Sequence, residues 1–143
     1  MTNQYNYQGK CHCGNIHYSF KTSIPAPDFR VRQCSCSFCQ KHGNRYISDP
    51  NGTLEYVIDQ AQKLRRYRFG TKTADFFVCE ECGVVPFVTC EIKNQTFAVL
   101  NINTLDEIGE FSTETGLADY SEELVEQRLE RRKKNWIGTV TCK

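Results

Sequence analysis

The chain has 143 residues, and its 18 Lys and Arg against 17 Asp and Glu give a formal net charge of +1. This length suits one globular domain with its own hydrophobic core, so we expect residues 1–143 to form a single domain. The balanced charge supplies no strong field that would attract nucleic acid or an anionic membrane. The first ten residues lack the apolar region of a signal peptide, and no segment is apolar over the width of a bilayer, which predicts a cytoplasmic protein.

Short strands dominate the pattern along most of the chain. Alternating apolar and polar residues, bounded by turn residues, predict strands within segments 10–20, 30–36, 44–49, 53–58, 64–70, 74–79, 84–92 and 96–105. Gly14 marks a turn or bulge in the first of these segments, and Phe69-Gly70-Thr71 is a turn that is a candidate for lining a substrate pocket.

The pattern changes after residue 120. Ser121 and two Glu precede apolar residues at helical spacing, and the segment ends in basic residues that suit the C-terminal end of a helix. One helix is therefore predicted over 120–136, with Trp136 docking its end onto the sheet. The expected fold is a mostly β, metal-stapled small β-sheet domain with a C-terminal helix.

Nine cysteines are far more than a chain of this size usually has, and they lie at positions 11, 13, 34, 36, 39, 79, 82, 90 and 142. The odd number, the lack of a secretory signal and the clustering of seven of them argue against a disulfide framework. Thiols spaced as C-x-C cannot readily bond to each other, but they can converge on one cation. Metal binding is therefore the favoured interpretation.

Two of the clusters look like halves of one site. In a strand, Cys11 and Cys13 of "CHC" would point to the same face, and Cys79 and Cys82 of "CEECG" form a CxxC turn followed by glycine. Together they would make a closed, four-cysteine structural zinc site. This pairing leaves Cys34, Cys36 and Cys39 of "QCSCSFCQKHG" as a three-ligand set, which is typical of a zinc site that keeps an open position.

A second pairing is compatible with the same spacing. Cys36 and Cys39 could join Cys79 and Cys82 as an ordinary zinc ribbon, which would leave three other cysteines over. Cys90 is expected to be a buried small apolar residue on a strand, and Cys142 to be a thiol in a frayed tail.

The order of four segments, "GKCHCGNIHY", "CSCSFCQKHGNRY", "LRRYRFGTKTADFFVCEECGV" and "VLNINTLD", resembles the family of glutathione-dependent formaldehyde-activating enzymes and the related centromere protein V. The resemblance covers residues 8–110 and all seven clustered cysteines. It implies an Mss4-like β fold and two zinc ions per chain. The implied ligands are Cys11, Cys13, Cys79 and Cys82 for a structural zinc, and Cys34, Cys36 and Cys39 for a second zinc at the reaction centre.

The resemblance also implies a carbon–sulfur lyase, which adds a thiol, typically glutathione, to a small aldehyde to form S-hydroxymethyl glutathione, or cleaves it. Three thiolates make zinc an anionic centre and a poor generator of hydroxide, so thiol exchange at the metal is favoured over activated water. His42 is a candidate for moving the proton, and Lys41 and Arg45 are candidates for holding a carboxylate of a glutathione-like ligand.

An alternative is a non-catalytic zinc-binding module in which both clusters are structural and the β surface binds a protein. The basic run "RLERRKK" is interpreted as a solvated helix face, so no nucleic-acid partner is expected, and the oligomeric state is not predicted.

Overall fold

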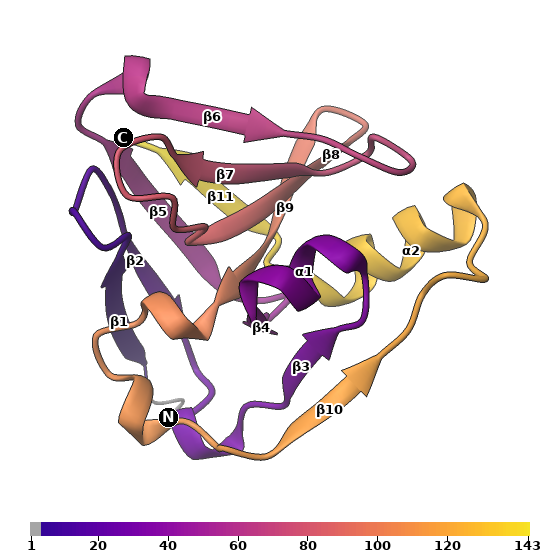
Figure 1. Ribbon diagram of the computed structural model, residues 1–143. Helices are drawn as coiled ribbons and strands as arrows, with labels where there is room; N and C mark the ends of the chain where they lie inside the picture. Colours follow the sequence, from indigo (N-terminus) through magenta and orange to yellow (C-terminus); the bar gives the residue numbers. More distant parts are fainter. Residues whose placement is uncertain (1–3) are drawn as a thin grey trace.

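Two β-sheets form the core of the structure, and two short helices lie beside the larger one (Figure 1). The computed structural model describes residues 4–143. Residues 1–3, which the predicted domain includes, lie outside this range. The predicted mostly β fold is confirmed.

The smaller sheet contains four strands. In spatial order they are β1 (Tyr5–Lys10), β2 (Ile16–Thr22), β5 (Thr53–Ile58) and β11 (Thr139–Cys142). Neighbouring strands are antiparallel except for β5 and β11, which are parallel.

The larger sheet contains seven strands. In spatial order they are β10 (Thr115–Ala118), β3 (Val31–Cys34), β4 (Arg45–Ile47), β9 (Gln95–Asn101), β8 (Phe87–Ile92), β7 (Asp75–Cys79) and β6 (Leu64–Tyr67). Only β10 and β3 pair in parallel among these.

The helices and short helical turns connect these strands. Within residues 4–143 the two α-helices are α1 (Ser37–His42) and α2 (Val125–Asn135), and four 3-10 turns cover Ala26–Asp28, Ala61–Lys63, Ile102–Thr104 and Ile108–Glu110. In the part of the chain that the structure describes, no helix has the length and apolar character needed to cross a membrane.

The main hydrophobic core lies between the two sheets. Tyr56 of β5 packs on Phe77 of β7 and Phe87 of β8, with ring centroids 5.5 and 4.9 Å apart. Phe20 and Leu54, from the smaller sheet, are fully buried in the same cluster. Burial of such large apolar side chains stabilises the face-to-face packing by about 1.5–3 kcal/mol each.

The larger sheet is also covered on its other face. Alternate residues of β8 and β9 point away from the smaller sheet, and Val88, Cys90 and Val99 form a second buried cluster with Cys39 and Trp136. Both faces of these central strands are buried, which explains why the sequences of β8 and β9 contain nearly continuous apolar runs. The expected burial of Cys90 and the docking of Trp136 on the sheet are confirmed.

Several predicted boundaries are wrong. The predicted first strand is a hairpin, because Cys11 to Asn15 form the turn between β1 and β2. The C-terminal helix begins at Val125 rather than near Ser121, and Gln127 accepts a hydrogen bond from the backbone N–H of Leu124 at its N-terminus. The chain then continues into β11, so Cys142 is paired opposite Tyr56 and is not in a frayed tail.

Candidate functional site

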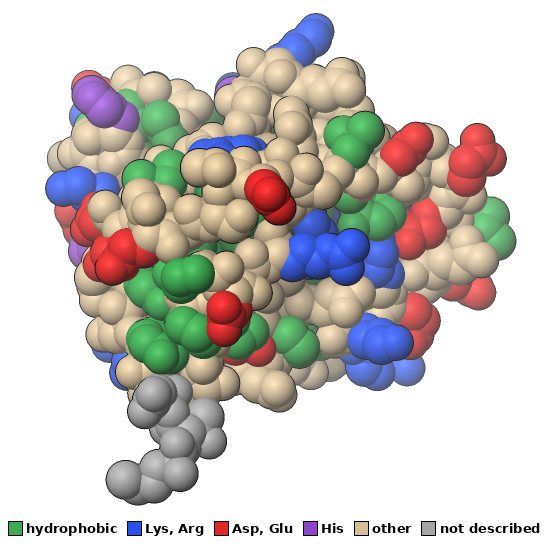
Figure 2. Space-filling view, turned by 90° about the horizontal axis from the view of Figure 1, so that it is seen from below, with side chains coloured by type: hydrophobic (Ala, Val, Ile, Leu, Met, Phe, Trp, Pro, Cys, Tyr) green, Lys and Arg blue, Asp and Glu red, His purple; other side chains and the backbone are tan. Residues whose placement is uncertain are grey.

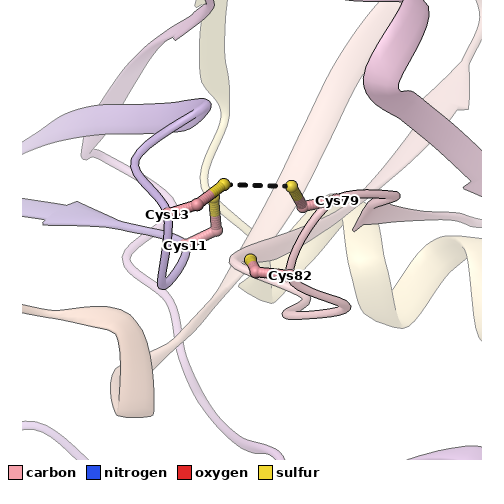
Figure 3. A group of neighbouring side chains, drawn as sticks. All are labelled: Cys11, Cys13, Cys79 and Cys82. Atoms are coloured by element: carbon pink, nitrogen blue, oxygen red, sulfur yellow. Dashed lines mark hydrogen bonds between the residues drawn. The ribbon is translucent and has the colours of Figure 1, made fainter.

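The first cysteine cluster joins the two sheets. Cys11 and Cys13 come from the turn between β1 and β2, and Cys79 and Cys82 come from the end of β7 and the turn after it (Figure 3). All four sulfur atoms lie within 4.8 Å of one another. The Sγ atoms of Cys13 and Cys79, 66 residues apart in the sequence, are separated by 3.5 Å. Four convergent thiols at this separation fit a closed tetrahedral zinc site.

Two similar turns present these thiols. In the second turn the backbone N–H of Gly83 donates to the carbonyl of Cys79 at 2.7 Å, and Gly83 has a φ of 80°. Gly14 follows the first pair with a φ of 88°, a conformation that a residue with a Cβ adopts only at a cost. The glycine after each pair therefore allows the backbone to wrap around the sulfur atoms.

The thiols of this cluster differ in their protonation. Burial raises the pKa of Cys11 to about 12. Burial also works against ionisation of Cys82, but hydrogen bonds from the backbone N–H groups of Cys13 and Val84 and from neighbouring thiols outweigh it and lower its pKa to about 6. The pKa values differ because four neighbouring thiols cannot all carry a negative charge without repulsion. A bound cation would offset this repulsion and allow all four thiols to ionise.

The second cluster lies at the end of β3 and the start of α1. The sulfur atoms of Cys34, Cys36 and Cys39 lie within 4.8 Å of one another. Cys36 caps the N-terminus of α1, since its sulfur accepts a hydrogen bond from the backbone N–H of Cys39 at 3.4 Å. The backbone N–H of Cys36 points in turn at the sulfur of Cys34, at 3.5 Å. A strand end followed at once by a helix start thus gathers all three thiols locally.

The three thiols share charge unequally. Hydrogen bonds from Cys34 and Cys39 lower the pKa of the Cys36 thiol, whereas the hydrogen bonds of Cys39 with Cys34 and Cys36 raise the pKa of the Cys39 thiol. Negative charge therefore settles first on Cys36, which also receives backbone N–H donors. Three soft, anionic donors that converge on one point fit a thiophilic cation such as zinc with one position left for another ligand.

A buried polar chain supports this cluster from behind. The side-chain amide of Asn44 donates to the hydroxyl of Tyr46 at 3.0 Å, which leaves the hydroxyl proton of Tyr46 free for the sulfur of Cys39 at 3.2 Å. Asn101 of β9 donates to the side-chain oxygen of Asn44 at 3.0 Å. The chain orients the hydroxyl of Tyr46 as a donor to the sulfur.

A cavity of about 450 Å³ opens beside the three thiols. Its walls come from β3, β4, α1, the turn after β6, the strands β7, β8 and β9, the loop that follows β10, and α2. Aromatic and apolar walls are formed by Tyr46, Phe69, Ala74, Phe76, Val88, Val99, Tyr120 and Trp136, and charged groups are supplied by Arg32, Asp119, Arg128, Arg131 and Arg132. The Cys34, Cys36 and Cys39 side chains form part of the lining, whereas the four-cysteine cluster does not line this cavity.

The remaining predicted site residues lie away from the cavity wall. Lys41 is exposed on α1, and His42 is exposed with its ring stacked on Phe38 at a centroid distance of 4.3 Å. Arg45 donates from Nε and Nη2 to the side-chain oxygen of Asn103, at 3.1 and 2.7 Å. Their roles in proton transfer and carboxylate binding stay predictions.

Sequence reasoning missed several residues that line the cavity. The basic run of α2 predicts a solvated helix face, but Arg132 is buried and Arg128 and Arg131 are half-buried. Their spacing of three and four residues places them on one side of the helix, which could have indicated a common surface. Tyr46 carried no such signal, because its contact with Cys39 depends on how β4 packs under α1. Phe69 and Thr71 do line the cavity, as their turn suggested.

Comparisons with known proteins agree with this architecture. The profile of the family described as "Glutathione-dependent formaldehyde-activating enzyme" matches residues 6–122. A crystal structure of a Rhodobacter sphaeroides protein superposes with a TM-score of 0.53 at 26% sequence identity, covering 73% of this chain and 96% of that one. No curated protein sequence matches the chain. Because the family profile covers most of the chain, including both cysteine clusters, the chain belongs to the glutathione-dependent formaldehyde-activating enzyme family.

Proposed function

We propose that the protein is a carbon–sulfur lyase that adds a thiol such as glutathione to a small aldehyde, and that catalyses the reverse cleavage. The observation that carries the proposal is the position of the three-cysteine cluster in the wall of a 450 Å³ cavity. A closed structural site needs no such cavity. Family membership supports the same chemistry.

The proposed zinc content is two ions per chain. The four-cysteine cluster would hold one ion as a structural site, and Cys34, Cys36 and Cys39 would hold the other. Zinc bound by three thiolates would lower the pKa of a substrate thiol, while the negative charge of its ligands would leave it a weak Lewis acid.

The reaction itself is balanced without any further reactant. The sulfur of the thiol attacks the carbonyl carbon of the aldehyde, a carbon–sulfur bond forms, and the proton lost by the thiol ends on the former carbonyl oxygen. The reverse reaction breaks the same bond. Nothing is oxidised or reduced, so the protein needs only to bring the two substrates together, to favour the thiolate and to return the proton.

The chain's own residues would contribute binding and orientation. Phe69, Phe76 and Trp136 would exclude water from the reacting atoms, which strengthens electrostatic interactions within the cavity. Tyr46, held by Asn44, would keep the sulfur of Cys39 in place through its hydroxyl. Ser35 lines the cavity as a candidate proton relay, in addition to the predicted role of His42.

Exchange spectroscopy tests the proposal directly. The exchange between free formaldehyde and its glutathione adduct is measured by NMR with zinc-loaded protein. The wild type should increase the exchange rate above the uncatalysed value, and Cys36→Ser should remove the increase, because it takes away one of the three thiols that would hold the second zinc.

Cys142→Ser is the matched control. Cys142 is an exposed cysteine on β11, outside both clusters, so this variant should exchange like the wild type. If the wild type does not exceed the uncatalysed rate with either glutathione or a smaller thiol, the lyase proposal fails, and the non-catalytic zinc module becomes the better interpretation.

A further inference from the structure

Four arginines line the cavity, and they fall into two kinds. Arg128 and Arg131 share one carboxylate, that of Glu123, at distances of 3.5 and 2.9 Å, and the guanidinium of Arg131 also lies 3.5 Å from the ring centroid of Tyr120. Arg32 and Arg132 have no carboxylate oxygen within 4.0 Å in residues 4–143. These two are therefore charges without a counter-ion in the described part of the chain.

Arg132 is the more buried of the pair. The residue is 7% exposed, and its guanidinium lies 4.9 Å from the ring of Trp136. One nitrogen, Nη1, donates to the hydroxyl of Thr73 at 2.8 Å and lies 3.5 Å from the sulfur of Cys90. Its Nε is buried and has no hydrogen-bond partner. A buried donor without an acceptor carries a free-energy cost, and the Nε of Arg128 is in the same state.

Arg32 reaches the cavity from β3, on the strand that leads into Cys34. Its Nη2 donates to the hydroxyl of Ser48 at 2.9 Å, and Ser48 donates in turn to the backbone carbonyl of Asn135 at the end of α2. Neither acceptor carries a charge. The guanidinium is thus fixed in orientation by neutral groups while its charge stays unbalanced.

The electrostatics of the cavity agree with these contacts. Burial lowers the pKa of Arg132, the contact with Cys90 raises it in part, and the nearby positive charge of Arg131 lowers it further. Asp119 is in the lining, but it is exposed and accepts a hydrogen bond from the backbone N–H of Ser121. Figure 2 shows basic and acidic side chains interleaved at the end of the molecule that carries α2. The four arginines and one aspartate of the lining give the cavity an excess of positive side chains, whereas the whole chain has a formal net charge of only +1.

We propose that Arg32 and Arg132 bind a carboxylate of the substrate, so that the cavity selects an anionic substrate and places its reactive end at Cys34, Cys36 and Cys39. The proposal rests on the proposed function in taking this cavity as the place where thiol and aldehyde meet. Arg132 lies on α2, outside the residues 6–122 that the family profile matches, so this part of the selectivity would come from the chain's own C-terminal segment. A planar guanidinium is the side chain best suited to a carboxylate.

The carboxylate could be on the thiol or on the aldehyde, and calorimetry with two pairs of probes distinguishes these sources. The first pair is 3-mercaptopropionate and 3-mercaptopropanamide. The second is 4-oxopentanoate and 2-pentanone, in which a ketone replaces the reactive aldehyde. The zinc-loaded full chain should bind the anionic member of one pair at least about 10-fold more tightly than the neutral member, as loss of a charge-assisted hydrogen bond would predict.

The variants Arg132→Gln and Arg32→Gln should each remove most of this preference, and Arg132→Lys should restore part of it. Arg65→Gln, at an exposed position on β6, is the matched control and should keep the preference of the wild type. Thermal melting checks that each variant folds. If Arg132→Gln does not fold, the binding preference of Arg32→Gln decides the result.

Two results would overturn the proposal. One is equal binding of both members of both pairs by the wild type. The other is a preference that survives in both glutamine variants, in which case the guanidiniums balance the cysteine thiolates and do not bind a ligand. An arginine-dependent preference without faster formaldehyde exchange would uphold the carboxylate site and count against the lyase function. Faster formaldehyde exchange without any preference for the anionic probes would uphold the lyase function and count against the carboxylate site.

Discussion

At the scale of single residues, the hydroxyl of Tyr46 links the three-cysteine cluster to the polar residues behind it. The residue is 6% exposed, and its hydroxyl accepts a hydrogen bond from Asn44 and donates one to the sulfur of Cys39. Burial and the neighbouring Cys39 raise the pKa of Tyr46, so the hydroxyl keeps its proton and stays a donor. The orientation of Cys39 therefore depends on a residue that is seven positions away and is not one of the three thiols of the cluster.

Replacing Tyr46 with phenylalanine should weaken both folding and the cluster. The change removes a buried donor and leaves the amide of Asn44 without its acceptor, which should lower the free energy of unfolding by about 1–3 kcal/mol. Urea unfolding followed by circular dichroism measures this loss. Zinc should also be released from the three-cysteine cluster at a lower chelator concentration than in the wild type.

Tyr67→Phe is the control for this prediction, because Tyr67 is a 41% exposed tyrosine on β6. It should unfold like the wild type within about 0.5 kcal/mol. Equal stability and equal zinc retention in the Tyr46 and Tyr67 variants would show that the hydroxyl of Tyr46 does not support the cluster.

At the scale of elements, α2 is a wall of the cavity. Its 11 residues are mostly polar and carry few apolar side chains for docking, so the contact of Trp136 just after its end is important. Trp136 is 6% exposed and packs in the cluster that contains Val88 and Val99. At the other end, Arg131 and Arg128 tie the helix to Glu123 and to the carbonyl of Tyr120.

Truncation of Trp136 to alanine should undock the helix. Loss of a buried indole should lower the free energy of unfolding by about 3–5 kcal/mol, and any folded fraction should have lost the anionic preference of the cavity. Leu124→Ala, at a 68% exposed position beside the same helix, should change stability by no more than about 0.5 kcal/mol. Similar urea midpoints for the two variants would mean that packing of Trp136 does not hold α2.

At the scale of the whole molecule, the two cysteine clusters have different structural roles. The four-cysteine cluster connects the turn after β1 in the smaller sheet with the end of β7 in the larger sheet. The three-cysteine cluster lies within one local segment, 34–39, which β3 and α1 already position. Metal at the first cluster would therefore contribute to folding, and metal at the second would contribute mainly to the cavity.

Chelation should separate the two clusters. A mild chelator should first remove one zinc per chain with little change in circular dichroism, and the second zinc should leave only with cooperative unfolding. Cys36→Ser should eliminate the first step, and Cys79→Ser should prevent stable folding. Cys142→Ser should behave like the wild type in both steps. Loss of both ions in one step, together with the fold, would contradict the distinct roles.

The sequence by itself determined the strand-rich fold class, the presence of a late helix and the grouping of seven cysteines. These features depend on alternation, turn residues and close spacing, which are local properties of the chain. The glycine after each cysteine pair is also a local feature, since Gly14 and Gly83 adopt a positive φ where the turn requires it.

Only the tertiary structure decided which half-sites meet and what surrounds the open cluster. Spacing left two pairings of Cys79 and Cys82 open, and the packing of the two sheets brings them to Cys11 and Cys13. The helix that looked like a solvated face turns Arg132 inward because Trp136 docks on the larger sheet. Contacts between residues far apart in the chain depend on how whole elements pack, and no local pattern encodes that packing.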